Sequence, residues 1–302
     1  MLMASVLIPT KNGETWIEAC LRGVYSQQGI AGVDVLIVDS GSTDRTLQIA
    51  GRYPVRIAEI PPNEFHHART RNFAATLSQA EYLIFLSQDA IPEDSNWLAS
   101  LLKNFSDSEV GAVYGRQLPR HETTSERYSA LSAIYGPTRI VKETANKRQL
   151  GFRYYHFSSA NAAVRRDVWA ATRFPEDLKV FEDLGIAKRI LDAGWKIVYE
   201  PDARVLHSHD HSTVGLFKRY FDIGYTFRRL GIWNARTRDS MTKEWSSMIK
   251  QKFGRPKIHD ARGKRGGIRM DMAKSAGFWL GVHERYLPLS VKRFLSAHKV
   301  FN

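Results

Sequence analysis

Short apolar runs alternate with amphipathic stretches through the first third of the chain. Residues 33–39 read VDVLIVD, which is typical of a buried strand, and Ile17, Leu21 and Val24 recur at helical spacing within 14–27. The whole pattern predicts strands at 5–9, 33–39, 55–60, 82–86 and 110–114, and helices at 14–27, 43–53, 68–78 and 95–105. Strands that alternate with helices of about 10–15 residues predict βαβ units and a largely parallel sheet.

The later part of the chain has a less regular pattern. Residues 117–155 are polar and predict a partly helical insertion, after which regular structure returns at 158–169 (SSANAAVRRDVW). A helix is expected near 182–193, with strands near 196–199 and 203–207. From residue 216 onward the pattern is mainly helical.

The charge divides the chain in two. The net charge is +13, but residues 216–302 contain 20 Lys and Arg against 6 Asp and Glu, whereas residues 1–215 contain 24 against 25. Two regions with such different charge predict two roles. A single Cys excludes a disulfide framework and favours a reducing compartment. The first residues read as a strand rather than a signal peptide, and no apolar run reaches the ~18 residues of a spanning helix.

Polar segments follow three of the expected strands. PTKN (9–12), DSGSTD (39–44) and SQD (87–89) stand at their carboxyl ends, which is where open α/β sheets bind ligands. These segments therefore predict one shared site. The chain has no G-x-G-x-x-G after the first strand, no G-x-x-x-x-G-K-[ST] and no G-x-S-x-G, which argues against a dinucleotide site, a P-loop and a hydrolase elbow.

Seven segments resemble the inverting glycosyltransferases of family 2, which have the GT-A fold. In order along the chain they are VLIPTKN (6–12), VLIVDSGSTDRT (35–46), HARTRNFA (67–74), FLSQDAIP (85–92), SSANAAVRRDVW (158–169), FEDLGIAKRILDAGWKIVYEP (181–201) and VLHSHDHS (205–212). The SQDA, HARTRN and His-Ser-His forms are most similar to the rhamnosyltransferase branch. The resemblance implies an α/β GT-A catalytic domain at 1–215, with a nucleotide-binding half at about 1–116 and an acceptor half at about 117–215. A basic, mainly helical region would follow at 216–302.

The resemblance also implies a divalent metal, Mg²⁺ or Mn²⁺, at the carboxylate of Asp89. Such an ion acts as a Lewis acid on the departing diphosphate. The family motif usually offers two acids one residue apart, but Ser87 occupies the first place here, which weakens the expectation of a metal. His207 and His209 share one face of an extended segment and are the candidate imidazole ligands, with acceptor contact as the alternative. A turn-capping role for Asp89 and a zinc site of histidines alone are the other interpretations.

The donor nucleotide is expected at the strand ends. By resemblance, Asp39 accepts an N–H from a pyrimidine base, and Arg71 binds phosphate near a helix N-terminus. The alternatives are a capped turn at Asp39 and a solvated helix start at Arg71. The expected donor-binding residues are Pro9, Thr10, Asn12, Asp39, Ser40, Gly41, Arg71, Asn72, Gln88 and Asn161.

Glu182 and Asp183 open the helix expected near 182–193. An inverting transfer needs one base that takes the proton of the acceptor hydroxyl, and a helix N-terminus favours the charged carboxylate. By resemblance, Asp183 is this base and Glu182 orients or contacts the acceptor. A helix-capping acid pair is the alternative.

The expected reaction transfers a sugar, with rhamnose favoured, from a nucleotide sugar to an acceptor. The first donor is dTDP-L-rhamnose, and UDP-sugars come next; the acceptor is a saccharide or a polyprenyl-diphosphate-linked precursor of a cell-surface polysaccharide. UDP-galactofuranose or UDP-N-acetylhexosamine on the same fold is the nearest alternative. A nucleotidyltransferase and a non-catalytic sugar-binding protein are alternatives of another class.

The basic region suggests where the protein works. Residues 216–233 read LFKRYFDIGYTFRRLGIW, which combines aromatic anchors at helical spacing with Lys and Arg, as interfacial helices do. We expect a cytoplasmic protein that docks to the anionic inner face of the cytoplasmic membrane. A helical cap on the catalytic domain is the alternative, and association into a homodimer is a further one. Nucleic acid is not an expected partner, because the region lacks a recognisable nucleic-acid-binding module.

Overall fold

The computed structural model describes residues 3–29, 32–120, 131, 134–209, 211–233 and 261–301. Most of the first half of the expected insertion at 117–155, and the middle of the basic region, therefore lie outside the described residues.

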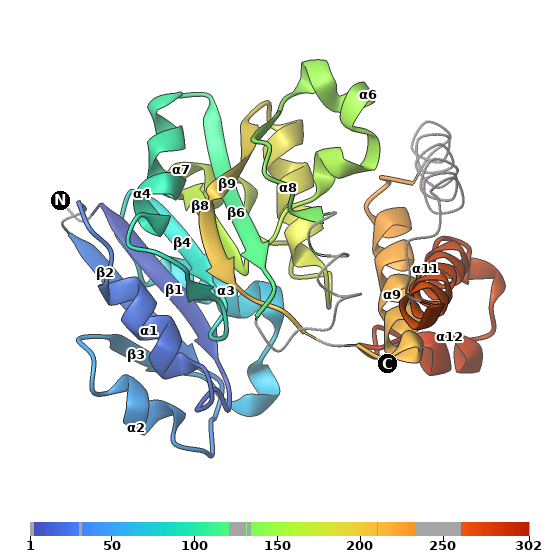
Figure 1. Cartoon of the computed structure of the whole chain (residues 1–302), viewed down its shortest axis with the longest axis horizontal. Coiled ribbons are helices and arrows are strands. Elements are labelled where there is room, and N and C mark those ends of the chain that lie inside the picture. Colours follow the sequence, from blue (N-terminus) through green and yellow to red (C-terminus); the bar gives the residue numbers. More distant parts are fainter. Residues whose placement is uncertain are drawn as a thin grey trace.

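One nine-stranded sheet forms the centre of the molecule (Figure 1). Its strand order is β3-β2-β1-β4-β8-β6-β9-β5, and β7 pairs with β9. The strands are β1 (Ala4–Thr10), β2 (Val33–Asp39), β3 (Arg56–Glu59), β4 (Tyr82–Leu86), β5 (Ile91–Pro92), β6 (Val110–Leu118), β7 (Ile140–Lys142), β8 (Asn161–Arg165) and β9 (Lys196–Leu206). The four strands at one end, from β3 to β4, are parallel, as their βαβ pattern predicts.

The other half of the sheet is mixed. Strand β8 lies between β4 and β6 and is antiparallel to both, whereas β6 and β9 are parallel to each other. The two strands expected at 196–199 and 203–207 form the single strand β9, with a register shift opposite Gly115 and Arg116. The expected fold class, an α/β protein with a largely parallel sheet flanked by helices, is confirmed.

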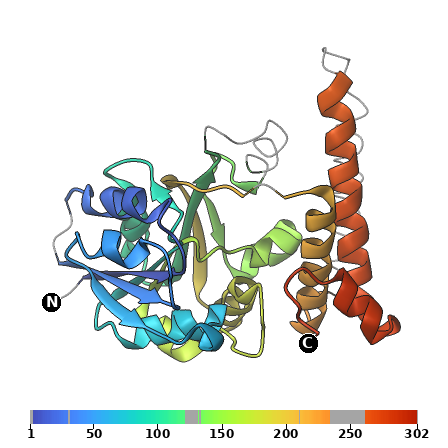
Figure 2. The ribbon, with the colours of Figure 1, turned by 90° about the horizontal axis from the view of Figure 1, so that it is seen from below.

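Helices cover both faces of this sheet (Figures 1 and 2). The side chains of β1 alternate between two hydrophobic cores. Val6 and Ile8 face the first core, and Leu7 faces the second. The first core packs α1 (Ile17–Tyr25), α2 (Thr46–Ala50) and α4 (Trp97–Leu102), and the second packs α3 (His67–Thr76), α7 (Arg166–Thr172) and α8 (Glu182–Asp192). The described residues also form one short helix, α6 (Lys147–Leu150). They contain five 3₁₀ turns: η1 (Pro62–Glu64), η2 (Lys103–Ser106), η3 (Thr144–Asn146), η4 (Gly151–Tyr155) and η5 (Glu284–Tyr286).

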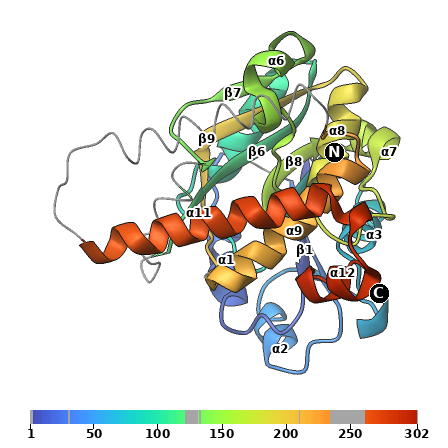
Figure 3. The same cartoon turned by 90° about the vertical axis from the view of Figure 1, so that its right-hand side faces the viewer.

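The basic region forms three described helices beside the sheet domain: α9 (Thr213–Arg229), α11 (Ala261–Val282) and α12 (Leu289–Leu295). Figure 3 shows the long helix α11 lying against α9. Glycines bring the two backbones together, since a Cβ on Gly281 would meet the Phe221 carbonyl oxygen at 2.1 Å and one on Gly224 would meet the Phe278 carbonyl oxygen at 2.2 Å. No helix in the described ranges is long and apolar enough to cross a membrane.

The helical region is continuous with the second core. Phe227 of α9 and Phe278 of α11 are buried in the same cluster as Leu184 and Ile190 of α8. The expected division after residue 215 falls inside α9, whose first residue is Thr213. The change in charge after residue 215 therefore does not coincide with a boundary of the hydrophobic core.

Candidate active site

The loops after β1, β2 and β4 are joined by hydrogen bonds. The Asn12 backbone N–H donates to Ser42 Oγ (2.8 Å), and Asn12 Oδ1 accepts from the Thr43 backbone N–H (2.9 Å). Gln88 clamps Lys11, because it accepts from the Lys11 N–H and donates to the Lys11 carbonyl, both at 3.0 Å. The three strand ends that the sequence singles out therefore form one connected edge.

Asp39 is buried at the end of β2, where its carboxylate organises its own loop. It accepts from the backbone N–H groups of Gly41 (2.9 Å) and Ser42 (2.8 Å). Gly41 has a φ of 81°, which glycine adopts without strain. Ser40 Oγ donates to the Thr10 carbonyl (3.1 Å), and Pro9 precedes this contact on β1. The expected base-binding residues thus lie together, with the carboxylate partly committed to the turn.

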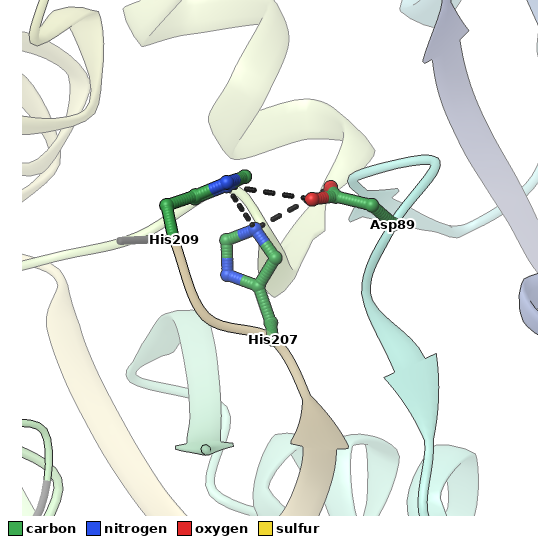
Figure 4. Close-up of side chains that lie close together, drawn as sticks. All are labelled: Asp89, His207 and His209. Atoms are coloured by element: carbon green, nitrogen blue, oxygen red, sulfur yellow. Dashed lines mark hydrogen bonds and ion pairs between the residues drawn. The ribbon is translucent and has the colours of Figure 1, made fainter. Parts of the chain in front are cut away.

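Asp89, His207 and His209 form a compact cluster (Figure 4). The carboxylate of Asp89 lies after β4, the two imidazoles lie after β9, and their ligand atoms are within 4.8 Å of one another. Asp89 Oδ1 is 3.4 Å from His207 Nε2, Asp89 Oδ2 is 3.4 Å from His209 Nε2, and the two Nε2 atoms are 3.0 Å apart. One carboxylate and two imidazoles are a donor set that suits Mn²⁺.

Gln117 fixes which nitrogen of His207 faces this cluster. The Gln117 amide nitrogen donates to the Tyr135 hydroxyl (2.9 Å) and to Ser158 Oγ (2.8 Å), so its oxygen is the group that contacts His207 Nδ1 at 2.8 Å. His207 Nδ1 therefore donates to Gln117, and Nε2 is the nitrogen that faces Asp89 and His209. A metal-ligating histidine is oriented in this way by an outer partner. The sequence interpretation missed Gln117.

Protonation in the cluster favours cation binding. Burial by itself would raise the pKa of Asp89, but His207, His209 and Arg120 together hold that pKa well below its usual range. Burial, with His207 next, lowers the pKa of His209 to about 4, against the effect of Asp89. At neutral pH the cluster therefore offers an ionised carboxylate and a neutral His209 imidazole.

Arg120 lies against the same cluster and was also missed. Its guanidinium stacks on Trp16, with 3.8 Å from Cζ to the ring centroid. It donates to the main-chain carbonyls of Ser208 (3.1 Å) and Asp89, and it lies 3.4 Å from Asp89 Oδ2. The side chain is only 14% exposed.

Glu182 and Asp183 begin α8, as expected, after a strained residue. Phe181 has φ 57° and ψ 33°, a left-handed conformation that is uncommon for an aromatic residue. Burial first, and the charge of Glu182 second, raise the pKa of Asp183 to about 6, while Arg71 and Ser159 act in the opposite direction. Asp183 Oδ1 is shielded from solvent and has no hydrogen-bond partner within the described ranges. A buried carboxylate oxygen without a partner is suited to accept a proton from a ligand.

Arg71 and Glu182 form a buried ion pair. Arg71 Nη1 is 2.8 Å from Glu182 Oε1, and the two side chains are 11% and 6% exposed. The positive charge of Arg71 is therefore largely matched by Glu182. The pair ties α3 to the start of α8 and so orients the acid pair.

Asn72 and Asn161, which the sequence assigns to donor binding, are buried and bond to groups of the protein itself. The Asn72 amide donates to the Phe174 carbonyl and to Glu176 Oε1, both at 2.9 Å, and its oxygen accepts from Trp169 Nε1 and from the Phe174 N–H. All of its hydrogen-bonding capacity is used within the protein.

Asn161 is fully buried at the start of β8. Its oxygen accepts from Trp97 Nε1 (2.8 Å), and its amide nitrogen donates to the Ala203 carbonyl (2.9 Å) and the Arg116 carbonyl (3.4 Å). The missing side chain of Gly115 provides the room, since a Cβ there would lie 2.3 Å from the Asn161 amide nitrogen. The Asn161 amide is therefore bonded on all sides to groups of the protein itself.

Short contacts link the cluster of Asp89, His207 and His209 to the acid pair. Ser158 contacts Gln117, and its neighbour Ser159 lies beside Asp183. Burial is the main cause that raises the pKa of Tyr135, whose hydroxyl contacts Gln117, and the nearby charge of Asp183 raises it further. The carboxylates of Asp89 and Asp183 thus belong to one network.

The C-terminal helices contact the residue before the acid pair. The Arg219 guanidinium of α9 lies 5.0 Å from the Phe181 ring centroid, and the His298 ring meets the same ring edge-to-face at 5.9 Å. Asp222 of α9 is fully buried and holds His298 by accepting from its backbone N–H (3.0 Å) and contacting its Nδ1 (2.8 Å). The helical region therefore packs against Phe181 and helps to hold its left-handed backbone conformation.

Comparison with known proteins identifies the family of this chain. The model of Glycosyl transferase family 2 matches residues 5–171. The O-antigen chain rhamnosyltransferase WbaN of Salmonella anatum is 34% identical, with 98% of this chain and 95% of that protein covered. The O-antigen chain rhamnosyltransferase RfbN of Salmonella typhimurium is 33% identical with the same coverage. The expected resemblance to the rhamnosyltransferase branch is confirmed.

Solved structures share the fold at lower identity. A mannosyltransferase from Pyrobaculum calidifontis in complex with GDP-Man and Mn²⁺ has a TM-score of 0.62 at 16% identity, covering 93% of this chain and 87% of that one. TarS of Staphylococcus aureus in complex with UDP-GlcNAc has a TM-score of 0.60 at 14% identity, covering 99% and 89%. The chain belongs to glycosyl transferase family 2 and is a glycosyltransferase with the GT-A fold.

Proposed function

We propose that this enzyme transfers rhamnose, with inversion, from dTDP-L-rhamnose to a saccharide or lipid-linked acceptor of a cell-surface polysaccharide. The choice of sugar is supported by the similarity to two O-antigen rhamnosyltransferases along nearly the whole chain. One structural observation carries the reaction type: Asp183 has a raised pKa and a buried, unpartnered oxygen, and a network joins it to the Asp89 cluster.

In the proposed reaction, Asp183 accepts the proton of the acceptor hydroxyl. The acceptor oxygen then forms a bond to C1 of the donor sugar while the bond from C1 to the diphosphate oxygen breaks, and the nucleoside diphosphate leaves with the electron pair. Glu182, held by Arg71, keeps the start of α8 in place and raises the proton affinity of Asp183. Attack from the face opposite the diphosphate inverts C1.

We assign Asp89, His207 and His209 as the ligands of a divalent cation, Mn²⁺ or Mg²⁺. Their fit rests on the compact donor set and on the Gln117 contact that turns His207 Nε2 toward Asp89. Two imidazoles favour Mn²⁺ over Mg²⁺, which prefers oxygen ligands. When bound, the ion supplies charge neutralisation for the departing diphosphate.

Donor binding is tested with a panel of nucleotide sugars. Thermal melting of the protein would be measured with dTDP-L-rhamnose, UDP-galactofuranose and UDP-N-acetylglucosamine, with and without Mn²⁺. Tight binding should raise the melting temperature by mass action, and dTDP-L-rhamnose should give the largest rise. A larger rise with either UDP-sugar would overturn the sugar assignment. Asp183→Asn should bind the donor as the native chain does but release no dTDP when acceptor is added.

The basic helices offer a surface for an anionic membrane, where a lipid-linked acceptor would be presented. Trp279, Tyr286 and Phe294 are 58%, 69% and 71% exposed, and Arg285 and Arg293 lie among them in sequence. Exposed aromatic groups near basic ones are typical of interfacial contact. Flotation with phosphatidylglycerol vesicles should recover the protein at low salt, and vesicles of phosphatidylcholine should not. Equal recovery from both, or none, would exclude docking through charge.

A further inference from the structure

Arg120 is a fixed, partly buried cation at the edge of the Asp89 cluster. Stacking on Trp16 and bonds to two main-chain carbonyls hold its guanidinium in one place. Surface arginines usually extend their charged ends into water, whereas this side chain is 14% exposed. Its Nε–H is buried and has no partner among the residues the structure describes.

The charge of Arg120 is only partly matched by the groups that hold it. Carbonyl oxygens orient a guanidinium without neutralising it. Asp89 Oδ2 is the charged partner, but it lies 3.4 Å away and is shared with His209. Arg71, the phosphate ligand expected from sequence, differs in this respect, because Glu182 at 2.8 Å pairs with it directly.

A charge count indicates what Arg120 would bind. The cluster contributes one carboxylate, since Ser87 stands where a second acid is usual and imidazoles are neutral when they ligate a metal. A divalent cation on this cluster leaves one net positive charge, and Arg120 adds another. Two fixed positive charges match a sugar-linked nucleoside diphosphate, which carries one negative charge on each phosphate. The planar guanidinium also suits phosphate oxygens.

We propose that Arg120, held between Trp16 and the carbonyls of Asp89 and Ser208, binds the β-phosphate of the nucleotide donor. The inference rests on the proposed function and deepens it. Arg120 would hold the diphosphate beside the cation, and it would stabilise the charge that develops when the bond to the sugar breaks. The other interpretation is that the guanidinium only occupies the position beside Asp89 that a metal cation would otherwise take.

The two interpretations differ in nucleotide affinity. Dissociation constants of dTDP and dTMP would be measured by calorimetry, with and without Mn²⁺, with UDP and UMP in parallel. Arg120→Gln should weaken dTDP binding roughly 10- to 100-fold, as expected for a lost charge-assisted hydrogen bond. Binding of dTMP should change less than about threefold. The affinity for Mn²⁺ alone should not fall.

Arg189→Gln is the matched control. Arg189 donates to two main-chain carbonyls, those of Thr172 (3.1 Å) and Arg173 (3.0 Å), but it lies at the opposite end of α8 from the acid pair. This variant removes the same charge and should leave all nucleotide affinities unchanged. Trp16→Leu should weaken dTDP binding in the same direction as Arg120→Gln, and circular dichroism would show that each variant is folded.

The possible results separate the two proposals. If the native chain binds neither dTDP nor UDP, the proposed function fails. If the native chain binds dTDP and Arg120→Gln binds it equally well, Arg120 has no phosphate role. Tighter Mn²⁺ binding in Arg120→Gln with unchanged dTDP binding would show that the guanidinium only fills the cation position. An equal loss of dTDP and dTMP affinity would contradict the assignment to the β-phosphate.

Discussion

The pH dependence of transfer tests the role of Asp183 as the base. Its pKa is raised from an ordinary value of about 4 to about 6. A base must be ionised to act, so at pH 7.5 roughly 30 molecules in 31 would be competent, and at pH 5 about one in ten. We therefore expect kcat/KM to fall about tenfold for each pH unit below pH 6. Asp183→Asn should have no measurable transfer at any pH.

The variant Glu182→Gln tests the direction in which the acidic limb of kcat/KM should move. Burial is the largest cause of the raised pKa and stays in the variant, whereas the negative charge of Glu182 is removed. Arg71 also loses its direct partner and becomes free to favour the ionised form of Asp183. The acidic limb of kcat/KM should therefore move to lower pH, while remaining above the ordinary carboxyl value of about 4.

The assay would follow dTDP release from pH 4.5 to 9 at constant Mn²⁺. Binding of Mn²⁺ must be measured over the same range, since protonated imidazoles would also lower activity in acid. Glu109→Gln, which removes an exposed charge that pairs with Lys196, should not move the limb. An acidic limb that stays in place or moves to higher pH in Glu182→Gln would refute the electrostatic link between the two acids.

Three further predictions concern the frame around the site. Gln117→Leu should weaken Mn²⁺ binding roughly 10- to 100-fold by calorimetry, because it removes the group that orients His207; unchanged affinity would contradict the assigned tautomer. Gly281→Ala should lower the free energy of unfolding by about 1–3 kcal/mol in urea titration, because the new Cβ meets backbone, whereas Gly136→Ala, which meets nothing within 4 Å, should have little effect. Asn161→Ala should cost about 2–4 kcal/mol by leaving Trp97 Nε1 and a buried carbonyl unpaired, with the dTDP affinity of the folded protein retained. Loss of donor binding without loss of stability would support the donor-binding role expected for Asn161.

Most strands before residue 114 could be predicted from their apolar runs, although the two-residue strand β5 was not expected. VDVLIVD at 33–39 becomes β2, and YLIFL at 82–86 becomes β4, with the polar segments at their ends joined as expected. The direction of β8 could not be predicted, since a short apolar run does not show which strands it pairs with. Strand β8 lies antiparallel between β4 and β6 because of contacts made in the folded protein, which the local sequence does not show.

The site residues that were missed depend on contacts distant in sequence. The apolar run of β6 ends at 114, so Gln117 and Arg120 were assigned to the insertion, although the strand continues to Leu118. Gln117 contacts His207, which is 90 residues away in the sequence. Arg120 stacks on Trp16, which directly precedes α1 near the start of the chain. The hydrogen bonds of Asn72 could not be predicted for the same reason, because its partners at 169–176 become neighbours only in the folded chain.

The contact of Arg219 and His298 with Phe181 limits how this enzyme can be recombined with its relatives. A chimera joined at residue 215 would cut α9 and would pair one protein's acid pair with another protein's helical support. Exchange of acceptor preference should therefore succeed only when α9 and the segment around His298 travel together with α8.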